Sequence, residues 1–169
     1  MRLYHGSNIS IEVVDLTKCR PNKDFGCGFY TTSILNQAND MAERVARRYG
    51  GLPCVTAFEI DDSVFEEDSI SIKRFNGISP EWAMFIMNNR TGDCIRNQEY
   101  MDNNLDNRYD IVIGPVANDD LSMIFRLFER RIINMEMLIH EMQFRKLTDQ
   151  FSFHTKRSIS LLKRLGSIK

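Results

Sequence analysis

No stretch of this chain approaches the roughly 20 consecutive apolar residues that a membrane-spanning helix requires. The opening segment MRLYHGSNIS has no apolar core of the length found in signal peptides. Lys and Arg together number 22 and Asp and Glu 23, so the formal net charge is -1 and no overall basic field favours nucleic acid or an anionic membrane. We therefore expect a cytoplasmic protein that does not act at a membrane.

Paired cysteines and linkers are also missing. Cys19, Cys27, Cys54 and Cys94 form no CxxC pair and have no histidine at ligand spacing, so the sequence signals neither a disulfide framework nor a zinc site. We expect four reduced thiols and no bound metal. The chain has 169 residues, 43% of them hydrophobic, with no repeat and no linker rich in Pro, Gly or Ser. This predicts one domain that spans residues 1–169.

What is present is an ordered series of short elements. Apolar residues recur at helical spacing before Gly50 and Gly51, and Ser79 and Pro80 suit the start of another helix. Period-two or β-branched segments predict strands at residues 2–5, 28–32, 54–60, 69–75, 109–117 and 150–155. Helices are predicted at residues 34–49, 79–90, 119–131, 133–146 and 158–165. Strands at both ends with helices between them indicate an α+β chain.

Three short segments combine glycine with aromatic or polar side chains: LYHGSN (3–8), DFGCGFYTT (24–32) and DQFSFHT (149–155). In the second segment, Gly26 and Gly28 remove side chains where the backbone must bend or approach another group closely. Such a segment is either a turn that leads into a strand or a cradle for a ligand.

Each segment also has a purely structural interpretation. His5 can be a strand histidine beside a turn, Tyr30 a core aromatic residue, and Gln150 an amide that caps its strand. In the last segment, Phe151 and Phe153 alternate with Gln150, so the phenylalanines face one side of the strand and the amide faces the other. Taken singly, none of these residues identifies a function.

Together and in this order, the segments YHGS, FGCGFYTT and QFSFHT resemble the NAD-binding core of the diphtheria-toxin-like and poly-ADP-ribose-polymerase-like ADP-ribosyltransferases. In that superfamily a His, a Tyr and a third residue, commonly Glu, come from three strand motifs, which correspond to His5, Tyr30 and Gln150. The wider pattern is similar to a smaller bacterial family of that superfamily, often encoded beside a small antitoxin-like protein. The resemblance implies a split antiparallel β-sheet core with flanking helices.

The resemblance also implies how NAD would be bound. The backbone of Gly6 would bond the nicotinamide carboxamide, His5 would bond a ribose hydroxyl of the adenosine half, and Ser7 would add a contact. Tyr30 would lie against the nicotinamide ring, and Gly28 would keep the incoming chain flat beneath the ligand. On this interpretation a side chain at Gly6 is unwelcome because the ligand approaches closely.

The chain departs from the superfamily pattern in two places. Met41 stands near the position of a second aromatic residue that closes on nicotinamide, although it can equally be a core residue of its helix. Gln150 offers a hydrogen bond without the charge of Glu, and a Glu substitution there is expected to retain or raise NAD cleavage. A general base could come from Asn118, Asp119 or Asp120, of which Asp119 is assigned to the binding site, although these residues could instead cap a helix.

These expectations describe a mono-ADP-ribosyltransferase that uses NAD as its substrate and is the toxin of a bacterial toxin-antitoxin pair. Cleavage of the bond between nicotinamide and ribose develops positive charge on the sugar, as in glycosidases. The expected partners are a small antitoxin protein and a macromolecular acceptor, protein or nucleic acid. Two alternatives remain open: an NAD glycohydrolase, and a catalytically weak NAD-binding or interaction module.

Overall fold

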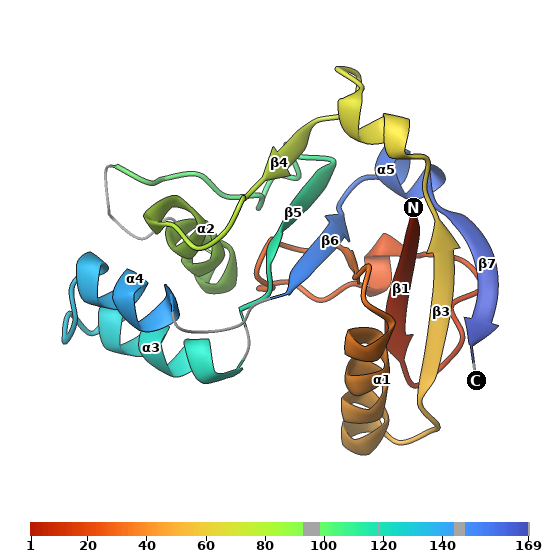
Figure 1. Cartoon of the computed structure of the whole chain (residues 1–169), viewed down its shortest axis with the longest axis horizontal. Helices are drawn as coiled ribbons and strands as arrows, with labels where there is room; N and C mark the ends of the chain where they lie inside the picture. Colours follow the sequence, from red (N-terminus) through yellow and green to blue (C-terminus); the bar gives the residue numbers. More distant parts are fainter. Residues whose placement is uncertain (93–98, 118, 144–147, 169) are drawn as a thin grey trace.

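The computed structural model describes residues 1–92, 99–117, 119–143 and 148–168, and only the backbone of Asp119 and Asp120. Within these residues, seven strands form two separate sheets (Figure 1). The first sheet has the order β1-β3-β7, with antiparallel strands β1 (Arg2–Ser7), β3 (Cys54–Glu59) and β7 (Lys163–Ile168). The second has the order β2-β6-β5-β4, with strands β2 (Phe29–Thr31), β6 (Asp149–Phe153), β5 (Ile111–Pro115) and β4 (Ile72–Arg74).

The helices divide between the two sheets. Helix α1 (Leu35–Tyr49) packs on β1 and β3, whereas α2 (Pro80–Thr91), α3 (Asp119–Glu129) and α4 (Met135–Gln143) gather beyond the second sheet (Figure 1). The short elements are α5 (Lys156–Ser160) and the 3-10 helices η1 (Leu16–Lys18) and η2 (Asp62–Glu66). Within the described ranges, no helix has both the length and the apolar character needed to cross a membrane. The α+β prediction is confirmed.

Local signals correctly predicted the two longest helices. The side chain of Ser79 accepts a hydrogen bond from the Trp82 N–H at the start of α2, and Pro80 is its first residue. Helix α1 ends at Tyr49 and is followed by Gly50, whose φ of 80° is a conformation that glycine adopts without strain. Trp82 is fully buried, as expected for a core residue.

The predicted helix at residues 158–165 is wrong over most of its length. Helix α5 ends at Ser160, and residues from Lys163 onward form β7, which pairs with β3. The segment is amphipathic in either conformation, and the open edge of β3 supplies the hydrogen bonds that select a strand. The prediction at 69–75 was too long, because only Ile72–Arg74 pairs with β5.

The second sheet is buried on both faces. One face packs on a cluster that contains Trp82 and Phe85 of α2, and the other packs on a cluster that contains Leu3 and Phe58 of the first sheet. As predicted, Phe151 and Phe153 point to the second cluster, so Gln150 and Ser152 point to the opposite face.

Candidate functional site

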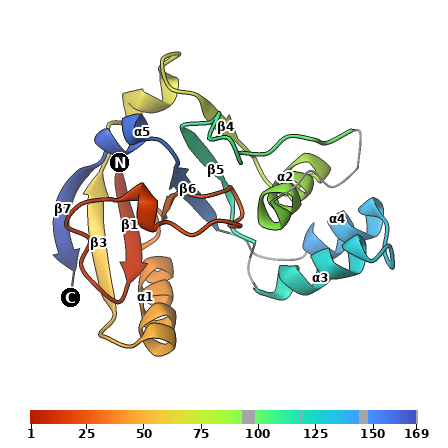
Figure 2. The ribbon, with the colours of Figure 1, turned by 180° about the vertical axis from the view of Figure 1, so that it is seen from behind.

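An isolated backbone bridge joins the two sheets between Tyr4 and Thr32. The Tyr4 N–H donates to the Thr32 carbonyl at 2.8 Å, and the Thr32 N–H donates to the Tyr4 carbonyl at 3.0 Å. Residues 8–28, between β1 and β2, cross the back of the molecule from the first sheet to the second (Figure 2). We call the meeting point of β1, β2 and β6 the sheet junction.

His5 lies at the sheet junction. Its Nδ1 is 2.7 Å from the Tyr30 carbonyl oxygen, and its ring stacks on Phe29 with centroids 4.5 Å apart. Because a carbonyl only accepts, Nδ1 carries the hydrogen, and burial lowers the pKa of His5. In the neutral ring Nε2 is therefore a hydrogen-bond acceptor, and no described residue bonds to it.

Tyr30 is half-buried, and its hydroxyl is engaged within its own loop. The hydroxyl donates to the Gly26 carbonyl at 2.6 Å and accepts from the Phe25 N–H at 3.0 Å. Burial, and next the charge of Asp24, raise the pKa of Tyr30 well above its usual value. His5 therefore contacts the backbone of Tyr30, and the phenol is not placed to transfer protons.

Gln150 lies near Tyr30 on the neighbouring strand. Tyr30 pairs with Ser152, and residues two apart on a strand share a face, so the Gln150 side chain projects on the same face as the Tyr30 ring. The residue is 8% exposed. Its Nε2 is 3.5 Å from Asp24 Oδ2, so Gln150 does not simply cap its strand.

Gly6 and Gly28 are glycine for a structural reason that the sequence did not reveal. A Cβ atom on Gly6 would lie 2.0 Å from the carbonyl oxygen of Ala38 in α1. A Cβ atom on Gly28 would lie 2.5 Å from Nδ1 of His154 and 2.9 Å from the Phe153 carbonyl oxygen. Contacts inside the protein therefore exclude side chains at both positions, whether or not a ligand also approaches.

The backbone of Gly6 nevertheless faces the sheet junction. Backbone groups alternate between the two edges of a strand, and Tyr4, two residues earlier, directs both of its groups to Thr32. The N–H and C=O of Gly6 therefore point to the same edge of β1, beyond the bridge. Ser7 follows on the same strand, half-buried and 3.4 Å from the side chain of Asn8.

Met41 is 41% exposed, so the interpretation of this residue as part of the core is wrong. It lies one turn after Gln37, whose Oε1 accepts a hydrogen bond from Thr32 at 2.8 Å. Met41 thus shares the helix face that approaches the sheet junction. Asp119 begins α3, but its side chain, that of Asp120 and all of Asn118 lie outside the described part of the chain, so their proposed roles stay predictions.

His154, which was not among the residues expected in the site, is 2% exposed. Nδ1 is 2.9 Å from the Cys27 carbonyl oxygen and Nε2 is 2.8 Å from Ser152 Oγ. Burial lowers the pKa of His154 to about 4. The residue joins the loop before β2 to β6, which is a structural role, and only the fold brings these segments together.

A partly buried ion pair beside Gln150 was also not expected from the sequence. Asp24 Oδ1 lies 2.9 Å from both Nε and Nη2 of Arg90 in α2. Arg90 donates further to Ser122 Oγ and to the Ala117 carbonyl, each at 3.0 Å. The pair therefore connects the loop before β2 with α2 and the start of α3.

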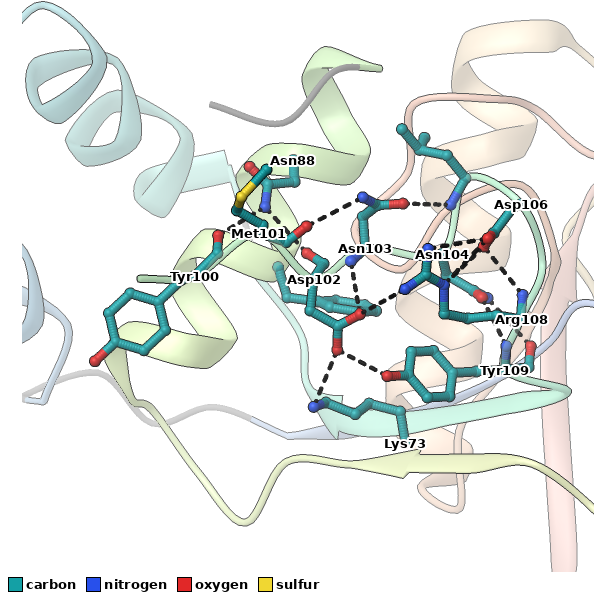
Figure 3. Close-up of polar contacts among 12 residues, drawn as sticks. Lys73, Asn88, Tyr100, Met101, Asp102, Asn103, Asn104, Asp106, Arg108 and Tyr109 are labelled. Carbon is teal, nitrogen blue, oxygen red and sulfur yellow. Dashed lines mark hydrogen bonds and ion pairs between the residues drawn. The ribbon is translucent and has the colours of Figure 1, made fainter. Parts of the chain in front are cut away.

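A second polar cluster lies at the β4 edge of the second sheet, the edge opposite β2 (Figure 3). Asp102 accepts hydrogen bonds from Lys73 Nζ at 3.1 Å and from the Tyr109 hydroxyl at 2.8 Å. Arg108 makes a two-pronged ion pair with Asp106 in the same loop. These five residues, which we call the Lys73 cluster, attach the loop after residue 99 to β4 and β5.

Two cavities in the described structure lie away from the sheet junction. One, of about 260 Å³, lies beside the Lys73 cluster and is lined by residues that include Glu81 and Phe85. The other, of about 380 Å³, is lined by residues that include Val14 and Ile159. Neither cavity is lined by His5, Tyr30 or Gln150.

The cysteines Cys19, Cys27 and Cys54 are free thiols, as predicted, and Cys94 lies outside the described residues. Among the side chains that the structure describes, no three His, Cys, Asp or Glu residues form a group that could hold a metal ion.

A family model for the protein of unknown function DUF3990 matches residues 1–164, so the chain belongs to this family. A comparison with curated proteins finds no match. The description of the family names no activity, and the resemblance to ADP-ribosyltransferases stays a prediction.

Proposed function

For this DUF3990 protein, we propose the activity of a mono-ADP-ribosyltransferase that cleaves NAD at the nicotinamide-ribose bond and transfers ADP-ribose to a macromolecule. The two separate sheets, with β1 and β2 as adjoining edges, support a split-sheet ADP-ribosyltransferase fold. The protein would act in the cytoplasm as the toxin of a toxin-antitoxin pair, with a small antitoxin protein as its inhibitor.

One observation carries the proposal: the strands of His5, Tyr30 and Gln150 adjoin at the sheet junction, and two of the three residues, His5 and Gln150, keep a hydrogen-bonding atom without a partner among the described residues. Nε2 of His5 and Oε1 of Gln150 have no partner among the described residues, and the backbone of Gly6 faces the same junction. The residues come from three strands, two near the start of the chain and one near its end. Their convergence supports a site for a ligand with several hydroxyl and amide groups.

Each residue would have a separate task. Nε2 of His5 would accept a hydrogen bond from a ribose hydroxyl of the adenosine half. The Gly6 N–H and C=O would bond the carboxamide, and the exposed part of the Tyr30 ring would pack on nicotinamide. Oε1 of Gln150 would accept from the ribose hydroxyl next to the bond that breaks. Its partial negative charge would lie near the positive charge that develops on the sugar.

Because the amide at position 150 is neutral, two alternative activities remain compatible with the site. Water in place of a macromolecular acceptor would make the protein an NAD glycohydrolase, and a weaker site would make it an NAD-binding module. Transfer of a single ADP-ribose is preferred over polymer elongation because Gln150 lacks the charge of Glu.

Incubation of the purified chain with adenylate-labelled NAD, with and without a cell lysate, tests the proposal. Nicotinamide release accompanied by label on protein or RNA is expected for the transferase. Release without a labelled acceptor would indicate a glycohydrolase, and binding without release a module. Absence of both binding and release would overturn the proposed function.

A further inference from the structure

Asp24 is held rigidly beside Gln150. Its Oδ1 accepts from two nitrogens of Arg90, and its Oδ2 accepts from the Ala117 N–H at 3.2 Å. The Asp24 side chain is 14% exposed. Because Arg90 is itself bonded to Ser122 and to the Ala117 carbonyl, neither carboxylate oxygen can turn away without breaking several bonds.

The carboxylate of Asp24 fixes which end of the Gln150 amide faces it. A carboxylate only accepts hydrogen bonds, so the nitrogen of the amide must point to Oδ2, at 3.5 Å, and the oxygen must point away. No described residue bonds that oxygen, and every fully buried side-chain nitrogen or oxygen among them has a partner. Oε1 therefore remains accessible from outside the protein.

The same carboxylate makes glutamic acid unsuitable at position 150. A carboxylate there would lie about 3.5 Å from that of Asp24. Two acidic groups at such a distance cannot both ionise freely, and the positive charge of Arg90 is already bonded to Asp24. Glutamine supplies an accepting oxygen without this repulsion.

We propose that Asp24 is a positioning residue that holds the Gln150 amide with its oxygen toward the ribose, and that its charge is the reason position 150 is glutamine. That the amide oxygen faces a ribose rests on the proposed function, whereas the pairing of the Asp24 and Gln150 side chains rests on the structure alone. This inference reverses the sequence-based expectation that a Glu substitution retains or raises NAD cleavage.

A charge exchange tests the proposal with Asp24→Asn, Gln150→Glu and the double variant that carries both changes. Each is measured by thermal unfolding and by kcat and KM for nicotinamide release. Gln150→Glu is expected to lower Tm by about 5 °C, because like charges meet in a half-buried site. Each single variant is expected to lower kcat at least about tenfold while KM changes less than about threefold.

In the double variant one carboxylate and one amide again face each other. We therefore expect losses in Tm and in kcat that are clearly smaller than the sum of the losses in the two single variants, with full recovery prevented because an amide at position 24 cannot accept from both Arg90 and the Ala117 N–H. If the double variant loses as much Tm and as much kcat as the two single variants together, the proposal is overturned. The matched controls are Asp106→Asn, an exposed carboxylate paired with Arg108, and Gln143→Glu, on the surface of α4.

If Asp24→Asn fails to fold, Gln150→Met provides an uncharged comparison of similar size. Met is expected to keep Tm within about 2 °C of the original, whereas Glu lowers it. Equal Tm values for the Met and Glu variants would overturn the pairing with Asp24. An original chain that neither binds nor cleaves NAD would overturn the proposed function and the role of the ribose, while the unfolding measurements would still decide the pairing.

Discussion

The sheet junction and the Lys73 cluster are both rich in polar side chains, but they differ in how their hydrogen-bonding groups are used. In the Lys73 cluster, carboxylates face the cations and the phenol that attach one loop to the second sheet. At the sheet junction, His5 and Gln150 are each fixed at one end by the protein and left with an acceptor at the other. Groups held in place but not fully bonded are suited to a ligand, whereas mutually bonded groups stabilise the fold.

The largest effect on stability is expected for His154. This residue sharpens the comparison because it lies near the sheet junction and yet has both ring nitrogens hydrogen-bonded within the protein. The pKa of His154 is about 4 in the folded chain and about 6.5 in the unfolded chain. The unfolded chain therefore takes up the proton first as pH falls. As the pH falls from 6.5 to 4, the free energy of unfolding is expected to decrease by about 3 kcal/mol. Above about pH 6.5 His154 is neutral in both states, so this stability is fully present.

Urea unfolding of the original chain and of His154→Gln at pH 7, 5.5 and 4 measures this effect. The variant is expected to lose less stability on acidification, because it lacks the group that resists protonation. Equal losses in the two proteins would contradict the assignment. His140→Gln, on the exposed surface of α4, is the control that should retain the original pH dependence.

His5→Ala is expected to reduce nicotinamide release about 100-fold, equivalent to about 2.7 kcal/mol in the transition state. The change removes the free Nε2 acceptor together with the ring that stacks on Phe29. Circular dichroism should show that the fold is kept, and His140→Ala should leave release unchanged. Full activity of His5→Ala would mean that the site does not lie at the sheet junction.

Gly6→Ala is expected to lower the free energy of unfolding by about 2 kcal/mol, because overpacking forces α1 away from β1. The added Cβ would meet backbone atoms of Ala38 and Ala42, which cannot move independently of the helix. Chemical denaturation measures the loss, with Ser7→Ala on the same strand as the control. If Gly6→Ala keeps its stability but no longer binds NAD, then close approach of the ligand is the main reason for glycine at position 6.

Lys73→Met has the smallest expected effect. Its Nζ is bonded to Asp102 and Glu81, and its side chain is 20% exposed. Loss of these partly exposed ion pairs should cost about 1 kcal/mol of stability. The rate of nicotinamide release should stay within about twofold of that of the original chain, because Lys73 lies away from the sheet junction. A large loss of release with intact folding would place the Lys73 cluster in the site.

Local signals were sufficient where the chain itself supplies the stabilising groups. Ser79 and Pro80 specify the start of α2, and Gly50 specifies the end of α1, through contacts within a few residues. Local signals failed at residues 163–165, which belong to β7 because that strand pairs with β3, about a hundred residues earlier in the chain. A short amphipathic segment has no local reason to continue a helix in preference to forming a strand.

The sequence by itself determined the α+β class, most of the elements and the three segments that meet at the sheet junction, because periodicity, caps and motif order are local properties. Tertiary structure alone decided why Gly6 and Gly28 are glycine, since the atoms that exclude a side chain belong to α1 and to His154. It also decided the environment of Gln150, because Asp24 is 126 residues away in the sequence. The charge next to a side chain depends on which distant segments pack beside it, and no local pattern encodes that.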